Sequence, residues 1–471
     1  MMLWLAIGMA LAGLAAAAPL RWAAAIVVLI LPLSGTVVLM AGGDPILLPL
    51  VVAVGFLGRH GLSLMNRPLR EQFLKLAQTD VLLLCFLVYC VVSGVFFPRI
   101  FADATRIYPQ VFVWGGVPLG PGHVSLVQLA YLFLGVWTYL ALRQAMLRTG
   151  MEFILGAVLL QIGLFGGFAF LQAAAGLVGV SIPVRWIVNN AGYALLTEIS
   201  EGGFVRVTSV FIEASYFAYW GSGALAFCYA LYINKIFPRV SLALLAILGV
   251  ALILSTSSTA YFGVLVVGVY GVIHAMLDTD KRRRDRGLVV ILFGAVMALG
   301  CLAVVFTSSA GFAGKLRGMI ESVTIYKGQS DSASIRTILS DSSVQNAADT
   351  YLLGTGYGSA RSSGLVYQLL GTVGLPGMLL FVLAMWPLLG RAFRRLRTGE
   401  DAVSAAGSFA LLATLAAMGV SGSDLALPNM IWAYAAIAAA PVAQRAAARA
   451  RWSEMTRSAE PIEAGAMRDR L

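Results

Sequence analysis

Charged residues are scarce in this chain. Only 12% of its 471 residues are Asp, Glu, Lys or Arg, whereas 59% are hydrophobic, and long apolar runs recur from end to end. This balance excludes a soluble globular protein of this size. It also excludes a transmembrane β-barrel, whose strands alternate between apolar and polar residues. The sequence therefore predicts an all-α, polytopic membrane protein built as a transmembrane helical bundle.

Histidine and cysteine are also scarce, with three His and four Cys in the chain. The cysteines lie inside apolar runs and have neither metal-ligand nor disulfide spacing, so we interpret them as small core residues. The HExxH motif of metallohydrolases and the GxSxG motif of triad hydrolases are absent. We therefore expect no metal and no cofactor. Any chemistry would rest on arginines, a carboxylate and hydroxyl groups.

The net charge of +11 comes from Lys and Arg that gather in short loops between the apolar runs. Such clusters hold loops on the cytoplasmic side of a membrane, which explains the charge better than nucleic-acid binding does. We expect no nucleic-acid partner. The clusters fall at residues 67–75, 143–148, 235–239, 281–284 and 391–397, and after residue 445.

The apolar runs predict twelve transmembrane helices. They lie near residues 3–18, 22–41, 80–97, 125–142, 153–178, 211–233, 240–254, 259–277, 288–306, 361–388, 403–420 and 428–444. The run 45–58 is a doubtful thirteenth, because about 14 residues are short for a crossing and better suit a re-entrant piece. Twelve spans place the N-terminus inside and thirteen place it outside.

Residues 1–445 are predicted to form a single transmembrane domain, and residues 446–471 a basic cytoplasmic tail. The loop charges then place three longer loops on the outer face, near 98–124, 179–210 and 307–360. The last loop mixes acidic and basic residues, so the positive-inside rule does not explain its charges. A loop of this length in a compact protein usually has a function.

The loop 307–360 ends in the stretch "DSASIRTILSDSSVQNAADTYLLGTGYGSARSS". Its first part predicts a helix with one apolar face and a second face that suits the wall of a wet cavity. The second face consists of Arg336, Ser340, Ser343 and Ala347. The alternative for Arg336 is a snorkelling side chain on an interfacial helix.

Three glycines follow this helix at alternate positions, Gly354, Gly356 and Gly358. Glycine at such positions lets the backbone turn sharply or pass close to another segment. The series lacks the Lys-Ser/Thr that follows a phosphate-binding loop, so it is not read as one. Arg361 comes next, at the outer mouth of the following span.

A second candidate stretch, "RVTSVFIEASYFAYW", runs from Arg206 to Trp220. Arg206 and Glu213 are seven residues apart and share a helix face if the helix of span 211–233 extends back to Arg206. Charge beside hydrocarbon is unfavourable unless it is paired, hydrated or functional. The two residues are either an ion pair that anchors the helix, or an anion-binding arginine beside a candidate base.

A reaction with a phosphate leaving group suits arginines, a carboxylate and hydroxyls. Arginine stays charged and binds phosphate through two donors at once, and several arginines neutralise a pyrophosphate. A carboxylate takes a proton from an attacking hydroxyl. In a membrane, a donor with these properties is a lipid-linked sugar pyrophosphate.

The chain resembles the O-antigen polymerase/ligase superfamily, which contains the Wzy-type bacterial polysaccharide polymerases. Three stretches carry the resemblance: "RVTSVFIEASYFA", "LSTSSTAYFGVLV" and "GTGYGSARSSGLVYQLLGTVGLPGMLLF". Their order and spacing are similar to those of the family over roughly residues 80–445. Ala214 stands where the family usually has Pro, and no His-Asn pair of the ligase branch is present.

The resemblance implies a membrane glycosyltransferase (GT-C-like) fold in the bacterial inner membrane, with the active site facing the periplasm. The implied activity joins repeat units carried on polyprenyl pyrophosphate, which are both donor and acceptor, without metal or nucleotide sugar. It implies Arg206, Arg336 and Arg361 as pyrophosphate ligands and Glu213 as the base or an acceptor-site anchor. A flippase and a chain-length regulator are the implied protein partners. An O-antigen ligase and a lipid-linked glycan transporter are the alternatives.

Overall fold

The structure is a computed structural model of the chain. It describes residues 2–42, 44–65, 76–110, 113–177, 180–190, 200–201, 204–278, 280–292, 294, 331–393, 399–422 and 429–440. The described residues are mostly helical, with three short two-stranded sheets at the ends of helices. The prediction of an all-α polytopic membrane protein is therefore confirmed at this level.

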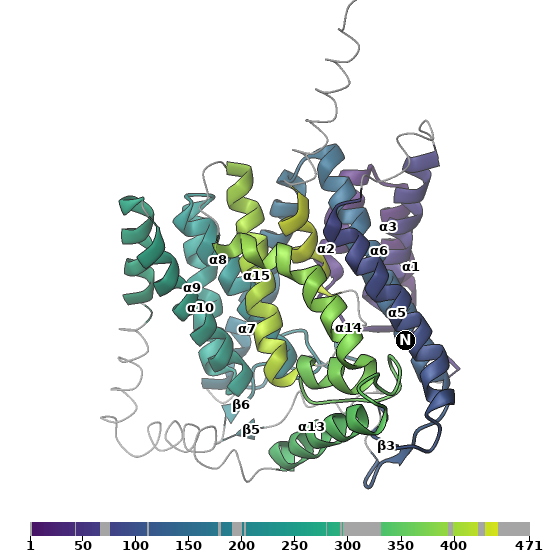
Figure 1. Cartoon of the computed structure of the whole chain (residues 1–471). Helices are drawn as coiled ribbons and strands as arrows, with labels where there is room; N and C mark the ends of the chain where they lie inside the picture. Colours follow the sequence, from purple (N-terminus) through teal and green to yellow (C-terminus); the bar gives the residue numbers. More distant parts are fainter. Residues whose placement is uncertain are drawn as a thin grey trace, which may run out of the picture.

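Seven described helices are long and apolar enough to cross a membrane (Figure 1). They are α3 (Leu48–Met65), α5 (Gln78–Ile100), α6 (His123–Thr149), α7 (Glu152–Leu177), α10 (Ser258–Leu277), α14 (Leu365–Leu389) and α15 (Gly399–Ser421). Shorter apolar helices are α1 (Met2–Ala17), α2 (Leu20–Ile30), α9 (Pro238–Leu254) and residues Met430–Ala440. The remaining helices and strands are α8 (Ala214–Ile233), α13 (Asp331–Asp349), η2 (Gly390–Phe393), β1 (Val37–Ala41), β2 (Asp44–Leu47), β3 (Arg106–Ile107), β4 (Val117–Pro118), β5 (Ser200–Glu201) and β6 (Phe204–Val205).

The predicted number of twelve spans is higher than these seven. Six predicted spans match long apolar helices. They are 80–97, 125–142, 153–178, 259–277, 361–388 and 403–420. The spans predicted at 3–18 and 240–254 are helices of 16 and 17 residues, α1 and α9. Most of the span predicted at 288–306 lies outside the described residues, as do the predicted tail 446–471 and much of the loop 307–360.

The predicted span 22–41 is wrong. The helix α2 ends at Ile30, and residues Val37–Ala41 form the strand β1, which pairs antiparallel with β2. Pro32 explains the break, because proline lacks the N–H that a continuing helix needs.

The short re-entrant piece predicted at 45–58 is also wrong, because α3 is a full helix of 18 residues, Leu48–Met65. Arg59 and His60, which directly follow the predicted end at residue 58, form hydrogen bonds inside the bundle. Arg59 Nε donates to the carbonyl of Ala18 at 2.8 Å, and His60 shares a buried hydrogen bond with Gln144. These bonds compensate the polar groups, so the helix continues past them.

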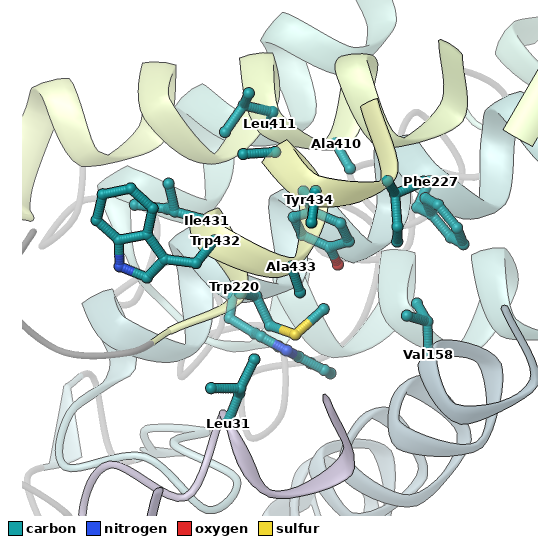
Figure 2. Close-up of a cluster of buried hydrophobic side chains, with 14 of the residues drawn as sticks. Leu31, Val158, Trp220, Phe227, Ala410, Leu411, Ile431, Trp432, Ala433 and Tyr434 are labelled. Atoms are coloured by element: carbon teal, nitrogen blue, oxygen red, sulfur yellow. The ribbon is translucent and has the colours of Figure 1, made fainter. Parts of the chain in front are cut away.

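The helix α8 forms the centre of the bundle. All its residues except Tyr216 and Tyr232 are buried, and it packs against α9, α10 and α15. Figure 2 shows the core around Trp220 and Phe227 of α8, with Leu411 of α15 and Tyr434 of the helix 430–440 beside them. The tyrosines, serines and glycines of α8 are tolerated because neighbouring helices, not lipid, surround it.

The described parts of the three loops predicted on the outer face lie at one end of the bundle (Figure 1). There α13 lies across the end of the bundle rather than along it, near the β3 hairpin, while β5 and β6 lie at the same end. The loops are joined by hydrogen bonds, such as that from the Thr105 hydroxyl to Asn346 Oδ1 at 3.0 Å. This end of the molecule therefore holds all four residues of the predicted site.

Candidate functional site

The segment 206–213 is a buried turn that leads into α8. The side chain of Gln172 on α7 accepts the backbone N–H of Thr208 at 3.0 Å and of Ser209 at 2.8 Å. The Ser209 hydroxyl donates to the carbonyl of Phe165 at 2.8 Å, and Ser209 has a φ of 51°. Because α7 satisfies these backbone groups, the turn is stable where a helix was predicted.

Glu213 is the last residue before α8 and has extended backbone, with φ −153° and ψ 164°. Its Oε1 accepts a hydrogen bond from the Ser215 hydroxyl in the first turn of the helix. The partial positive end of α8 also favours a carboxylate at this position. The side chain is half-buried, so the carboxylate is oriented by the protein and is still partly exposed.

Arg206 and Glu213 do not share one helix face, because the helix does not extend back to Arg206. Helix α8 begins at Ala214, and residues 206–213 are not helical. Arg206 instead follows directly after β6, with a half-buried side chain whose Nε is buried. The spacing of seven residues therefore says nothing about how the two side chains face one another.

The three glycines that follow α13 are confirmed as positions of close backbone approach. Their φ angles are positive, at 86° for Gly354, 102° for Gly356 and 80° for Gly358. A Cβ on Gly354 would lie 2.5 Å from the carbonyl oxygen of Thr372, and one on Gly356 would lie 2.6 Å from that of Ser93. Only glycine fits both the backbone angle and the available space.

The glycine segment packs into a break in α14. The helix is interrupted at Gly374, which has φ 63° and ψ −167°. The N–H of Thr355 donates to Gly371 O at 3.0 Å, that of Gly356 donates to Thr372 O at 2.8 Å, and that of Leu375 donates to Leu352 O at 2.9 Å. These bonds satisfy the backbone groups that the break leaves without helical partners, as an apolar surrounding requires.

Arg361 lies between this glycine segment and the start of α14, and its side chain is exposed. Its backbone N–H donates to Tyr108 O at 2.7 Å, and its guanidinium donates to Gln110 O at 3.4 Å. Its neighbour Ser362 is buried and accepts a hydrogen bond of 2.7 Å from Ser343 of α13. The position of Arg361 is therefore fixed by its contacts with neighbouring segments, while its guanidinium stays exposed.

Arg336 lies in the described part of α13, as predicted, and is half-buried. The expectation that its helix face lines a wet cavity is wrong for Ser343 and Ala347. Ser343 and Ala347 are buried, and a Cβ on Gly371 of α14 would come within 3.0 Å of Ser343. This face packs α13 onto α14 instead, and Arg336 lies one to two turns beyond the packed part.

The four predicted residues thus come from three separate segments at one end of the bundle. Described contacts join the Arg361 segment to α13 and to the loop before α6. Arg206 and Glu213 flank the turn that α7 supports. The structure places three arginine-bearing segments, one of which also carries Glu213, at the same end of an apolar bundle.

The core beneath the turn leaves little room for a ligand. A cavity between Phe211, Tyr219 and Asn429 has a volume of about 20 Å³, which holds about one water molecule. This cavity is too small for a sugar or a pyrophosphate. Among the described residues, no group of three or more His, Cys, Asp or Glu has a geometry that suits a metal ion.

A buried ionic cluster near the start of α5 was not predicted from the sequence. Arg143 of α6 donates to Asp80 Oδ2, and both side chains are fully buried. The Tyr139 hydroxyl donates to Asp80 Oδ1 at 2.7 Å, and the N–H of Ala77 donates to Asp80 Oδ2 at 2.6 Å. The signal was present in the sequence, because an Asp at the edge of an apolar run needs a partner. Since every Asp80 oxygen is bonded, we interpret the cluster as structural.

Gln172 was missed as well, although a glutamine inside the apolar run 153–178 is conspicuous. Its role became visible only through its bonds to residues 36 and 37 positions later in the chain. It positions the segment that carries Arg206 and Glu213.

Comparison with known protein families and with curated protein sequences found no match to this chain.

Proposed function

We propose that the chain is a polysaccharide polymerase that joins polyprenyl-pyrophosphate-linked repeat units at the outer face of the bacterial inner membrane. One observation carries the proposal. An apolar helical bundle presents Arg206, Arg336, Arg361 and Glu213 at one end, on segments held by buried hydrogen bonds. A lipid-linked substrate has its tail in the bilayer and its pyrophosphate at the interface, which matches this arrangement.

The arginines hold the pyrophosphate in this proposal. Arg361 has an exposed guanidinium on a fixed backbone, and Arg336 lies on the helix that packs against the Arg361 segment. Arg206 lies on the turn before α8, at the same end of the bundle. Guanidinium groups bind phosphate oxygens through paired donors and stabilise the charge that develops as the pyrophosphate leaves.

The proposed reaction is a direct displacement. A hydroxyl oxygen of the acceptor sugar attacks the anomeric carbon of the donor, and the bond from that carbon to the pyrophosphate oxygen breaks. Glu213 takes the hydroxyl proton, with its carboxylate oriented by Ser215. The polyprenyl pyrophosphate leaves with the bonding electron pair, and the configuration at the anomeric carbon is inverted.

The break in α14 is the one observation that favours the transporter alternative. Discontinuous helices form substrate sites in transporters, where the freed backbone groups face the ligand. Here residues 352–356 of the same chain bond the freed groups of residues 371–375. The break therefore holds a segment of the protein in place, which fits a fixed catalytic frame better than a moving gate.

Arginine substitutions test the proposal. Arg206→Ala and Arg336→Ala should abolish polymer formation in a strain that lacks the chromosomal gene, while membrane-inserted protein remains at the wild-type amount. Arg99→Ala is the matched control, because Arg99 is exposed in the last turn of α5 and its guanidinium donates to the carbonyl of Val95 in its own helix. Full activity in both the Arg206 and the Arg336 variants would contradict the proposed site.

A further inference from the structure

An apolar groove separates α2 from the first half of α7, away from the candidate site. Its volume is about 460 Å³, which lies in the range of small-molecule sites in proteins. It is lined by Trp22, Ala25, Ile26, Leu29, Glu152, Phe153, Gly156, Ala157 and Leu160. On both helices these residues recur at intervals of three and four, so one continuous stripe of each helix forms a wall.

The two helices run in the same direction along the groove, and their N-terminal ends meet at its rim. Trp22, near the start of α2, packs edge-on against Phe153, near the start of α7, with ring centroids 4.9 Å apart. Leu29 and Leu160 line the other end of the groove. The groove therefore has a polar mouth at the two helix starts and an apolar interior.

The rim carries an unusual set of charges. Arg21, in the first turn of α2, lies over the Phe153 ring at 4.8 Å from its centroid. A basic residue at a helix start opposes the helix dipole, and α2 has no acidic residue in its first turn to offset it. Glu152, in the first turn of α7, is the carboxylate that lines the groove. Together the two helix ends, Arg21 and Glu152 leave an excess of positive charge.

A bound phosphate would neutralise the excess positive charge at this rim. Helix N-termini bind phosphate groups through backbone N–H groups, and arginine adds paired donors. Glu152 would then lie beside the phosphate, where it suits a cationic group that is joined to the phosphate. Trp22 and Arg21 are both exposed at the rim, and Trp and Arg are typical of the membrane interface.

We propose that this groove binds a bilayer phospholipid with an ethanolamine headgroup. One acyl chain lies along Ala25, Gly156 and Leu160. The phosphate binds Arg21 and the two helix starts, and the primary ammonium binds the Glu152 carboxylate. A choline headgroup has no N–H to donate to Glu152, and a glycerol headgroup has no positive charge, so both fit this rim less well.

Gly156 offers a way to block the groove without disturbing the fold. A Cβ at this position meets no atom within 4 Å, so a larger side chain would enter the open groove. Leucine also favours helix more than glycine does. Gly167 lies on the same helix and is equally open, which makes Gly167→Leu the matched control.

The test is native mass spectrometry of the full chain, released from detergent after incubation with phosphatidylethanolamine, phosphatidylcholine or phosphatidylglycerol of the same acyl chains. The wild type and Gly167→Leu should retain the ethanolamine lipid preferentially. Gly156→Leu should weaken its binding by about tenfold or more, which is about 1.4 kcal/mol. Glu152→Gln should remove the preference for ethanolamine over choline, and Arg21→Gln should weaken the binding of all three lipids.

Three results would overturn the proposal. Equal retention of the lipid by Gly156→Leu and Gly167→Leu would place the lipid elsewhere. An unchanged headgroup preference in Glu152→Gln would remove the ethanolamine contact. A dimer that Gly156→Leu alone abolishes would show that a second copy of the chain covers the groove. Neither the lipid site nor its test depends on the polymerase activity.

Discussion

The backbone N–H of Arg361 donates to the carbonyl oxygen of Tyr108 at 2.7 Å. This bond joins the segment before α14 to the loop between α5 and α6, beside the contact of Thr105 with Asn346 at 3.0 Å. Arg361 is therefore held through its main chain. Its side chain is exposed and free to be changed without loss of the bond.

Arg361 gives the first prediction. Arg361→Ala should lower polymer formation by at least about tenfold, which corresponds to the loss of one charge-assisted bond of about 1.5–3 kcal/mol. Arg361→Lys should restore only part of the activity, because an ammonium group lacks the planar pair of donors. The measurement is the rate at which membranes consume lipid-linked repeat units, with equal amounts of each variant confirmed by immunoblot.

Arg99→Lys is the control for Arg361→Lys. Both residues are exposed, and the control should keep the wild-type rate. An Arg361→Lys variant as active as the wild type would show that the pyrophosphate does not bind the paired N–H donors of the Arg361 guanidinium.

Glu213 gives the second prediction. Glu213→Gln keeps the side-chain oxygen that accepts the Ser215 hydroxyl but removes the group that takes a proton, so the fold should persist. The rate should fall by about 10²–10⁴-fold, the usual contribution of a general base. Ser215→Ala removes the hydroxyl that orients the carboxylate, and it should reduce the rate less than Glu213→Gln does. A Glu213→Gln variant with the wild-type rate would exclude Glu213 as the base.

Gly356 gives the third prediction, which concerns stability. Gly356→Ala should destabilise the protein by about 1–3 kcal/mol for the strained backbone angle alone, and further because the Cβ meets Ser93 O at 2.6 Å. The measurement is the Tm of the purified protein in detergent.

Substitutions of two other glycines distinguish the effect of the backbone angle from that of the close Cβ contact. Gly115 has φ 78° but open space around a Cβ, so Gly115→Ala should lower the Tm less than Gly356→Ala does. Gly120 has neither the positive angle nor a close neighbour, and its change to Ala should leave the Tm unchanged. A Tm of Gly356→Ala equal to that of Gly120→Ala would refute the packing of the glycine segment into α14.

Local sequence patterns predicted the helices well where apolar runs end at charged residues or breakers. The runs 80–97 and 403–420 correspond to α5 and α15. The pattern failed at 22–41, where Pro32 ends a helix inside a continuous apolar run, and at 45–58. There the polar side chains of Arg59 and His60 are bonded within the bundle, so they do not end the helix.

The candidate site was predictable in its residue types but not in its geometry. The turn before Glu213 depends on Gln172, which belongs to a different helix. The glycines were recognisable as positions where the backbone passes close to another segment. The segment they contact, the break in α14 at Gly374, was not predicted. Both relationships are long-range, so periodicity and local propensity carry no information on them.

The buried pair Asp80–Arg143 gives the fourth prediction. Removal of either charge alone, as in Asp80→Leu or Arg143→Met, should destabilise the protein by about 3–5 kcal/mol, because the remaining charge is buried without its partner. The double variant should be closer to the wild type than either single variant, since two apolar side chains replace the pair. The free energy of unfolding of the wild type, the two single variants and the double variant is measured by denaturation in detergent. Additive losses in the double variant would show that the two charges do not stabilise one another.

The size profile of lipid-linked glycan tests the proposed function most directly. It is measured in a strain without the gene, with and without the restored gene, and with the Glu213→Gln gene as the inactive control. We predict that single repeat units accumulate at the outer face without the gene, and that the polymer ladder returns only with the wild-type gene. A full ladder retained on the lipid carrier in the deletion strain would contradict polymerisation and indicate a ligase, and units trapped on the cytoplasmic face would indicate a transporter.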